Sequence, residues 1–77
     1  MNEIIVCEYG WILVGKAAVV SDKLIELQSA SIVRKWSNGR GIGALSKNAH
    51  KGEYTLDEIG TVVVERSKIL FSIPCEW

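Results

Sequence analysis

The feature that most constrains this chain is the alternation of short β-branched and aromatic runs with glycine and polar turn residues. Residues 3–9 and 11–20 are two such runs, and Gly10 separates them where a tight turn needs a residue that adopts positive φ. This pattern predicts a β-hairpin. Gly15, inside the second run, predicts a bulge or bend of the kind by which a small sheet curls toward closure.

Extended segments continue beyond this hairpin. Turn residues at 21–23 precede two further β-like segments, at 24–28 and 31–36, with a predicted irregularity at 29–30. Strict alternation within the second segment would place Trp36 on the same face as Ile32 and Arg34, because successive side chains of a strand point to opposite faces. The indole is therefore expected to share a face with a cation.

The centre of the chain interrupts the strand pattern. Residues 37–43 carry glycine at every second position from Gly39, which predicts a loop whose backbone a ligand can approach closely. Residues 43–50 favour a short helix of about two turns. Residues 53–59 are predicted to form a connection, within which the Thr-x-x-Glu spacing at 55–58 opens at most a single helical turn.

The last third of the chain returns to β-like composition. Gly60 precedes the β-branched run 61–65, and residues 68–73 form another run after the polar pair at 66–67. These two runs predict a second hairpin. Pro74 cannot donate a ladder hydrogen bond, so it is expected to end the last strand or to lie at an edge.

Short, closely spaced strands with one helical insertion predict a mostly β fold. The expected architecture is a small curled sheet or a partly closed barrel of the SH3-like or OB-like kind, with an open α+β sheet as the alternative. A chain of 77 residues is enough for one domain, residues 1–77. Three tryptophans and a 48% apolar composition in so small a domain favour a homo-oligomer.

Composition also restricts location and partners. The formal net charge is zero, which argues against a surface that attracts nucleic acid or membranes as a whole. No apolar run approaches the roughly 20 residues of a membrane span, and the opening residues do not form a signal peptide. We expect a cytoplasmic protein in which Cys7 and Cys75 are buried, reduced thiols.

Cations gather in one stretch of the sequence. Residues 34–51 contain five of the nine basic residues and no acidic residue, so a locally positive surface is expected. Trp36 offers a flat face for stacking on a base, and Arg40 offers a planar fork for phosphate. The predicted ligand-binding residues are Arg34, Lys35, Trp36, Arg40, Lys47 and His50. The alternatives are a core tryptophan for Trp36 and a solvated face for the lysines.

Catalysis has little support in the sequence. His50 is the sole histidine and has no cysteine near it, and no spacing typical of a metal site or an activated nucleophile occurs. Asp57 and Glu58 are adjacent acids that point different ways, as in a solvated turn. We therefore predict no catalytic residue, no metal and no cofactor. Trp11 and Trp77 are predicted to be packing or interface residues.

Several motifs between residues 31 and 75 form a recognisable set. Arg-x-Trp at 34–36 is followed by Gly-x-Gly-x-Leu at 41–45, by Thr-Leu-Asp at 55–57 and by Gly-Thr-Val at 60–62. In these motifs the chain resembles a group of short, functionally uncharacterised proteins found mainly in phages and prophages. It departs from their pattern at Ser37, where a glycine is expected, and at 48–50. The resemblance implies a phage or prophage context and a small β-rich fold, and it assigns no catalytic residue.

Two hypotheses of function follow from the sequence. In a phage setting, small oligomeric β proteins with basic, aromatic pockets are similar in kind to proteins that sequester host nucleotide immune signals. In this first hypothesis, Trp36 stacks on a base, Arg40 and loop N–H groups hold phosphate, and Lys47 or His50 closes a pocket between two copies. The second hypothesis is a protein-interaction module that inhibits or adapts a host or virion protein. Neutral charge disfavours a single-stranded nucleic-acid binder.

Overall fold

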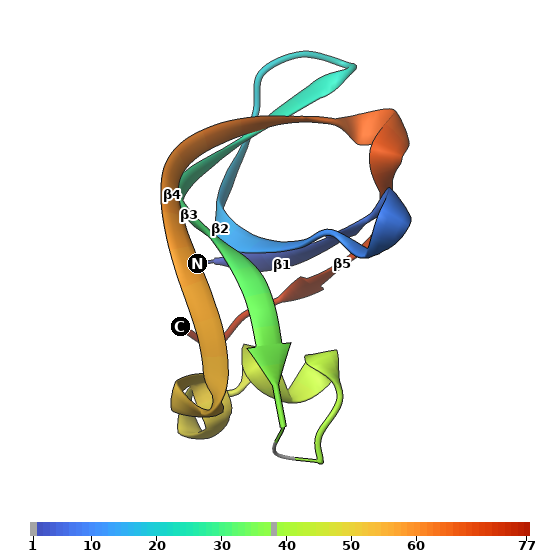
Figure 1. Cartoon of the computed structure of the whole chain (residues 1–77). Coiled ribbons are helices and arrows are strands. Elements are labelled where there is room, and N and C mark those ends of the chain that lie inside the picture. Colours follow the sequence, from blue (N-terminus) through green and yellow to red (C-terminus); the bar gives the residue numbers. More distant parts are fainter. Residues whose placement is uncertain (1, 38) are drawn as a thin grey trace.

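The computed structural model describes residues 2–37 and 39–77, which form strands joined by short 3-10 turns. The strands are β1 (Glu3–Cys7), β2 (Ile12–Val19), β3 (Leu24–Trp36), β4 (Tyr54–Glu65) and β5 (Ile69–Pro74). The 3-10 turns are η1 (Glu8–Gly10), η2 (Ile42–Ser46), η3 (Asn48–Glu53) and η4 (Arg66–Lys68). All five strands belong to one antiparallel sheet in the order β4-β3-β2-β1-β5, and Figure 1 shows how strongly it curls. The prediction of a mostly β fold with a curled sheet is confirmed.

The first hairpin and its glycines are as predicted. β1 and β2 pair antiparallel around η1, where Tyr9 and Gly10 both have positive φ. The pairing of β2 with β3 shifts register between Val14 and Lys16, so Gly15 forms the predicted irregularity. A Cβ atom on Gly15 would lie 3.0 Å from the carbonyl oxygen of Gln28, which shows how closely the two backbones approach there.

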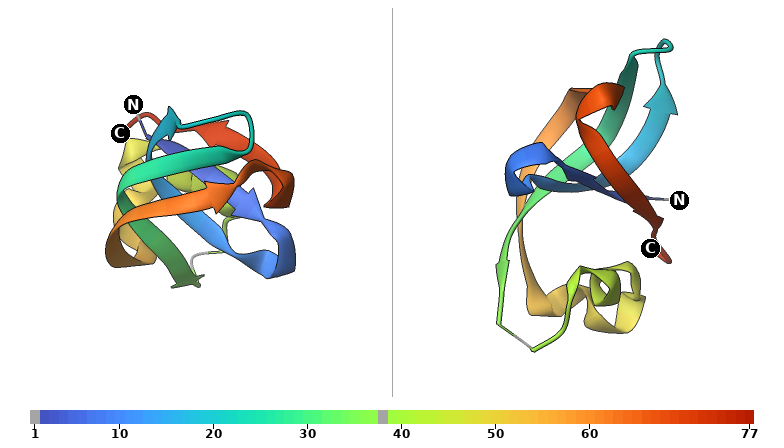
Figure 2. Two further views of the ribbon diagram at one scale, coloured as in Figure 1. Left: turned by 90° about the horizontal axis from the view of Figure 1, so that it is seen from above. Right: turned by 90° about the vertical axis from the view of Figure 1, so that its right-hand side faces the viewer.

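The predicted second hairpin is wrong. β4 and β5 follow each other in sequence, but β5 pairs with β1 and β4 pairs with β3. The short turn η4 joins β4 directly to β5, so that two consecutive strands become the two edges of the curled sheet (Figures 1 and 2). Pro74 ends an edge strand, as predicted, where its missing N–H costs no ladder hydrogen bond.

Three other local predictions differ from the structure, and strand pairing overrides local sequence in the first two. β3 is one continuous strand through Ser29 and Ala30, but the predicted irregularity is present there as a positive φ at Ser29 and a register shift. Residues 54–59 are the first half of β4 and not a connection, so the Thr-x-x-Glu spacing caps no helix. The predicted helix at 43–50 is instead two 3-10 turns, η2 and η3, separated by an extended Lys47. We call η2 and η3 together the insertion.

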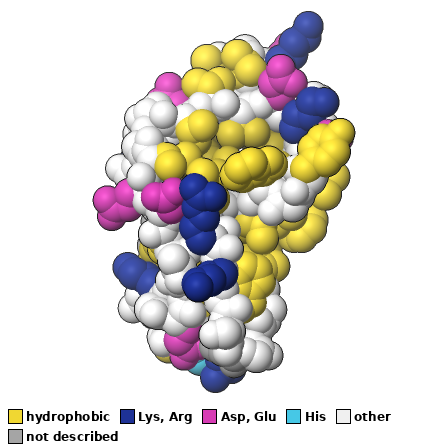
Figure 3. Space-filling model, viewed as in Figure 1, with side chains coloured by type: hydrophobic (Ala, Val, Ile, Leu, Met, Phe, Trp, Pro, Cys, Tyr) yellow, Lys and Arg dark blue, Asp and Glu magenta, His cyan; other side chains and the backbone are white. Residues whose placement is uncertain are grey.

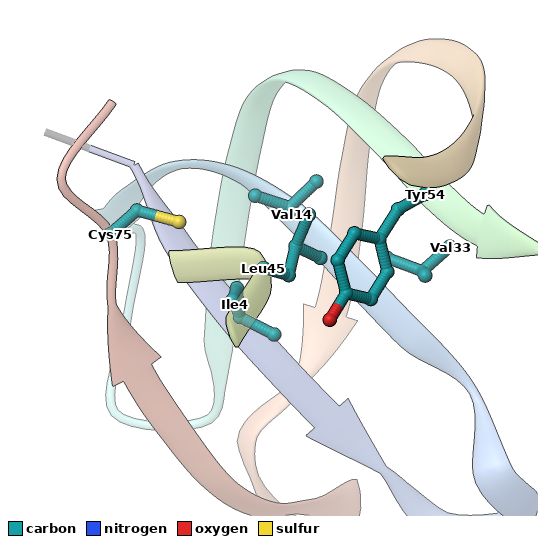
Figure 4. Close-up of a cluster of buried hydrophobic side chains, with 6 residues drawn as sticks. All are labelled: Ile4, Val14, Val33, Leu45, Tyr54 and Cys75. Atoms are coloured by element: carbon teal, nitrogen blue, oxygen red, sulfur yellow. The ribbon is translucent and has the colours of Figure 1, made fainter. Parts of the chain in front are cut away.

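Each face of the sheet contributes to a separate buried core. The sheet core contains Ile5, Cys7, Leu13, Leu27 and Ala30. The insertion core contains Ile4, Val14, Val33, Leu45, Tyr54 and Cys75, and Figure 4 shows these side chains gathered together. Ile4 and Ile5 point to opposite faces, and both are buried because the curled sheet closes over one face and the insertion covers part of the other.

Cys7 and Cys75 are buried free thiols, as predicted, and they lie in different cores. Burial raises the pKa of both thiols, because an apolar environment disfavours the thiolate. Among residues 2–37 and 39–77, no helix has the length and apolar character needed to cross a membrane.

The buried thiols lead to a prediction about alkaline stability. A pKa raised by folding adds stability that is complete below the unfolded thiol's pKa, about 8.5, and is lost as the pH rises through the folded-state pKa. The urea midpoint is therefore expected to fall above that pH, and both thiols should react with a disulfide reagent more slowly than in unfolded chains. Cys7→Ser with Cys75→Ser serves as the control, in which this part of the alkaline decline disappears. Fast reaction of the native thiols at neutral pH would contradict the burial.

Candidate functional site

Trp36, the predicted stacking platform, lies at the end of β3 and is partly buried. It packs against the insertion core, and its ring centroid is 5.4 Å from that of Tyr54. A register shift between Val33 and Lys35 turns Trp36 toward the face of Val33, so the expected shared face with Arg34 is not formed. The indole Nε1 donates a hydrogen bond of 2.7 Å to the carbonyl oxygen of Arg40. The indole therefore helps to hold the glycine-rich segment 39–43, which we call the glycine loop, against the end of β3.

The glycine loop presents carbonyl groups to the aromatic side chains. Besides the bond from Trp36, the hydroxyl of Tyr54 donates to the carbonyl oxygen of Gly41 at 2.6 Å. Gly39 has positive φ, and a Cβ atom on Gly39, Gly41 or Gly43 would meet no atom within 4 Å. The loop backbone is thus open to approach on its outer side, as the first hypothesis requires. Asn38, part of the predicted loop, lies outside the described residues.

Arg40 and His50 come together on one carboxylate. The Nε of Arg40 lies 3.3 Å from Oε1 of Glu53, and Nδ1 of His50 lies 3.3 Å from Oε2 of the same residue. Glu53 is just outside the acid-free stretch of sequence, and η3 folds it back against the two bases. An anion approaching Arg40 would have to compete with this carboxylate.

Two further predicted residues are also paired with acids from distant parts of the sequence. Nη2 of Arg34 lies 2.8 Å from Oδ2 of Asp57 on the neighbouring strand, and Nζ of Lys47 lies 3.4 Å from Oε1 of Glu76. Within the described residues, Lys35 is exposed and has no ion-pair partner. The structure thus brings Trp36, Arg40 and His50 to one end of the molecule, with an acid placed among the cations.

The Glu76 carboxylate also binds backbone. The Asn48 N–H donates to it at 3.2 Å, and this bond, together with Lys47, holds the pKa of the Glu76 carboxyl below its usual value. Such a group stabilises the fold above its unfolded pKa, about 4.3, and the contribution is lost as the pH falls through the lower folded-state pKa. The contact helps to fix residues 75–77 to the insertion.

A second surface was not predicted from the sequence. An open groove of about 350 Å³ lies between the η1 turn and the end of β4. We call it the aromatic groove; its lining residues are Cys7, Glu8, Tyr9, Trp11, Leu13, Val63, Val64, Glu65 and Lys68. Figure 3 shows hydrophobic side chains gathered on this part of the molecule. A larger hollow of about 580 Å³ lies between the turns at 21–24 and 65–67, but six of its seven lining side chains are polar or charged.

Tyr9 and Trp11 are the aromatic residues of the groove. Tyr9 is 95% exposed, and Trp11 and Val63 are each about half exposed. Tyr9 also has φ of 62°, in the left-handed region that costs a non-glycine residue about 1–2 kcal/mol. Because the Tyr9 ring is so exposed, it makes few packing contacts that could offset this strain. Trp11 was predicted to be a packing or interface residue, whereas no sequence signal marked Tyr9 or Val63.

Three charged residues also line the groove, and they come from both of its sides. Nζ of Lys68 lies 3.7 Å from Oε2 of Glu8, an exposed pair of weak net effect. Glu65 lies nearby at the end of β4, and no ion pair links it to another described residue. The groove therefore combines apolar and aromatic residues with charged ones, a combination common at protein-binding surfaces.

The strain at Tyr9 gives a testable prediction. Tyr9→Asn is expected to leave stability unchanged or to raise the free energy of unfolding by up to about 1 kcal/mol, because asparagine tolerates the left-handed region. Urea unfolding of the two proteins measures this difference. Tyr9→Phe keeps the strain and should differ from the wild type by less than about 0.5 kcal/mol. A clear loss of stability in Tyr9→Asn would show that the ring makes contacts that outweigh its strain.

Fold and surface together define a small antiparallel β-sheet protein with an apolar, aromatic-lined groove. Comparison with family models, with curated proteins and with solved structures finds no match to this chain. In the part of the chain that the structure describes, no group of three or more His, Cys, Asp or Glu side chains is arranged to hold a metal ion.

Proposed function

We propose that this chain is a non-catalytic, cytoplasmic protein-interaction module whose binding surface is the aromatic groove. The observation that carries the proposal is the gathering of exposed Tyr9, Trp11 and Val63 around one apolar hollow. Tyrosine and tryptophan dominate the binding energy of protein interfaces, because they remove a large apolar area from water at a low cost in side-chain entropy. An exposed apolar patch with a charged rim is typical of such interfaces.

The occupant that fits this surface is an extended protein segment with an apolar side chain. The groove is open to solvent and is lined in part by β4, an edge strand of the sheet. An added segment can pair with the free backbone groups of an edge strand while its alternate side chains fill the adjoining hollow. The resemblance to phage and prophage proteins supports a host or virion protein as one source of such a segment, and a homo-oligomer as another.

Selection from a displayed random peptide library tests this proposal. The expected result is enrichment of peptides with one central aromatic or large aliphatic residue, bound by the wild type and lost in Trp11→Ala. Trp11 is about half exposed, so its replacement should leave the fold intact, as circular dichroism and thermal unfolding can verify. Val19→Ala, at an exposed position of β2, is the matched control and should bind the same peptides. Equal recovery on wild type and Trp11→Ala would reject the groove as the binding surface.

The second candidate function is binding of a nucleotide-like anion beside Trp36. The observation that favours it is the meeting of Trp36, Arg40 and His50 at one end of the molecule, next to an open loop backbone. The carboxylate of Glu53 is paired with the guanidinium of Arg40, so an anion would have to displace that carboxylate.

The variant Glu53→Gln separates this second function from the first. If the anion site exists, isothermal titration with cyclic and linear nucleotides should show tighter binding to Glu53→Gln than to the wild type, because a competing carboxylate is removed. Arg40→Ala should abolish that binding. Absence of heat with every nucleotide, in both proteins, would exclude the site.

A further inference from the structure

Both edge strands of the sheet have an outer side that is not paired with another strand. β4 and β5 lie at opposite ends of the strand order, and within the described residues no strand pairs with the outer side of either one. Each edge presents unpaired backbone N–H and C=O groups, which can pair with another chain. Every copy of the protein therefore carries one edge of each kind.

Each edge contains a segment without the charges that usually prevent edge pairing, although β4 carries Asp57, Glu58 and Glu65 outside that segment. Natural edge strands carry lysine or other charges along their length. Here residues 61–64 of β4 are Thr-Val-Val-Val, and β5 is Ile-Leu-Phe-Ser-Ile-Pro, so both segments are free of charge. Pro74 is the one protective residue in these two segments, and it stands at the last position of β5.

Large apolar side chains are exposed on both edges. On β5, Leu70 is 63% exposed and Phe71 is 51% exposed, and on β4 Val63 is 54% exposed beside the aromatic groove. Exposed, charge-free segments of edge strands are sites of association between chains. The formal net charge of zero means that copies of the chain do not repel one another through their overall charge.

We propose that β5 of a second copy pairs with the free edge of β4 and places Phe71 in the aromatic groove. This inference rests on the proposed function, because it names the protein segment that the groove binds. The contact joins two different surfaces, so it is head-to-tail, and repeated contacts form a closed ring or a chain of copies. The partner copy completes the groove by covering Trp11 and Val63.

Light scattering coupled to size exclusion, with one substitution on each edge, tests the pairing. The wild type is expected to form an assembly larger than a monomer, whereas Val63→Lys and Phe71→Lys should each be monomeric. Both positions are about half exposed, so a lysine should be tolerated there, and thermal unfolding checks that each variant is folded. Val19→Lys, on a strand that is not an edge, is the matched control and should assemble as the wild type does.

Mixing the two edge variants gives the decisive result. Val63→Lys keeps an intact β5 and Phe71→Lys keeps an intact β4, so the mixture should form a dimer of one copy of each that grows no further. A monomeric wild type, or dimers formed by either variant alone, would overturn the inference. If the wild type is monomeric but still selects groove-binding peptides, the proposed function is retained and the partner is a different protein. If the wild type is monomeric and selects no peptide whose binding depends on Trp11, both the inference and the proposed function are rejected.

Discussion

Leu45→Ala is expected to lower the free energy of unfolding by about 2–5 kcal/mol. Leu45 is completely buried, and it is the side chain by which η2 enters the insertion core against Ile4 and Val14. Truncation removes buried methyl groups and leaves a cavity that the short 3-10 turn cannot readily fill. Since small domains have a total stability of about 5–15 kcal/mol, this loss is a large fraction of the whole.

Urea unfolding followed by tryptophan fluorescence measures this effect, because Trp36 and Trp77 both pack on the same core. Val19→Ala removes apolar atoms from an exposed side chain and should change stability by less than about 0.5 kcal/mol. A loss below about 1 kcal/mol in Leu45→Ala would mean that the insertion is not part of the cooperative core. In that case Leu45→Ala should also leave the unfolding midpoint of the sheet unchanged.

Burial on both faces of β1 and of the start of β2 could be read from the sequence, although an alternating pattern of apolar and polar residues does not reveal it. Ile4-Ile5-Val6-Cys7 and Ile12-Leu13-Val14 are continuous apolar runs, as expected for strands covered on both faces. The first hairpin, the irregularity at Gly15 and the β class could be predicted because each depends on residues close together in sequence. Which element covers the second face depends on packing of the insertion, which no local pattern specifies.

Strand partners were harder to predict than strands. The run after Arg66-Ser67 has the composition of a hairpin partner, but β4 is already paired along β3, and β1 offers the free edge that β5 takes. Residues 54–59 are polar enough to resemble a connection, and pairing with β3 imposes the strand. In both places, long-range pairing determines the structure and local propensity does not.

The predicted cationic site illustrates the same limit for charge. Residues 34–51 contain no acid, yet Asp57, Glu53 and Glu76 fold back onto Arg34, Arg40 and Lys47. Charge counted along a stretch of sequence does not measure charge on a surface. The aromatic groove could not be predicted for a related reason: its two sides, the η1 turn and the end of β4, are more than 50 residues apart.

Trp77→Ala is expected to cost about 3 kcal/mol, at the lower end of the range for large aromatic truncations because Trp77 is only half-buried. The indole packs on the insertion core, its Nε1 donates a hydrogen bond of 2.7 Å to the carbonyl oxygen of Leu45, and Lys51 Nζ lies 4.6 Å from the ring centroid. Trp77 therefore fixes residues 75–77 across the insertion. Urea denaturation, followed by circular dichroism because a fluorophore is removed, measures the loss.

Trp77→Phe separates the hydrogen bond from the packing. The ring still covers the core, but the Leu45 carbonyl loses its donor, so a smaller cost of about 1–2 kcal/mol is expected. The double variant Leu45→Ala with Trp77→Ala should be less destabilised than the sum of the two single variants, since either change releases the same contact between η2 and residue 77. Additive losses would show that the two side chains stabilise the insertion independently, and that residue 77 does not act through η2.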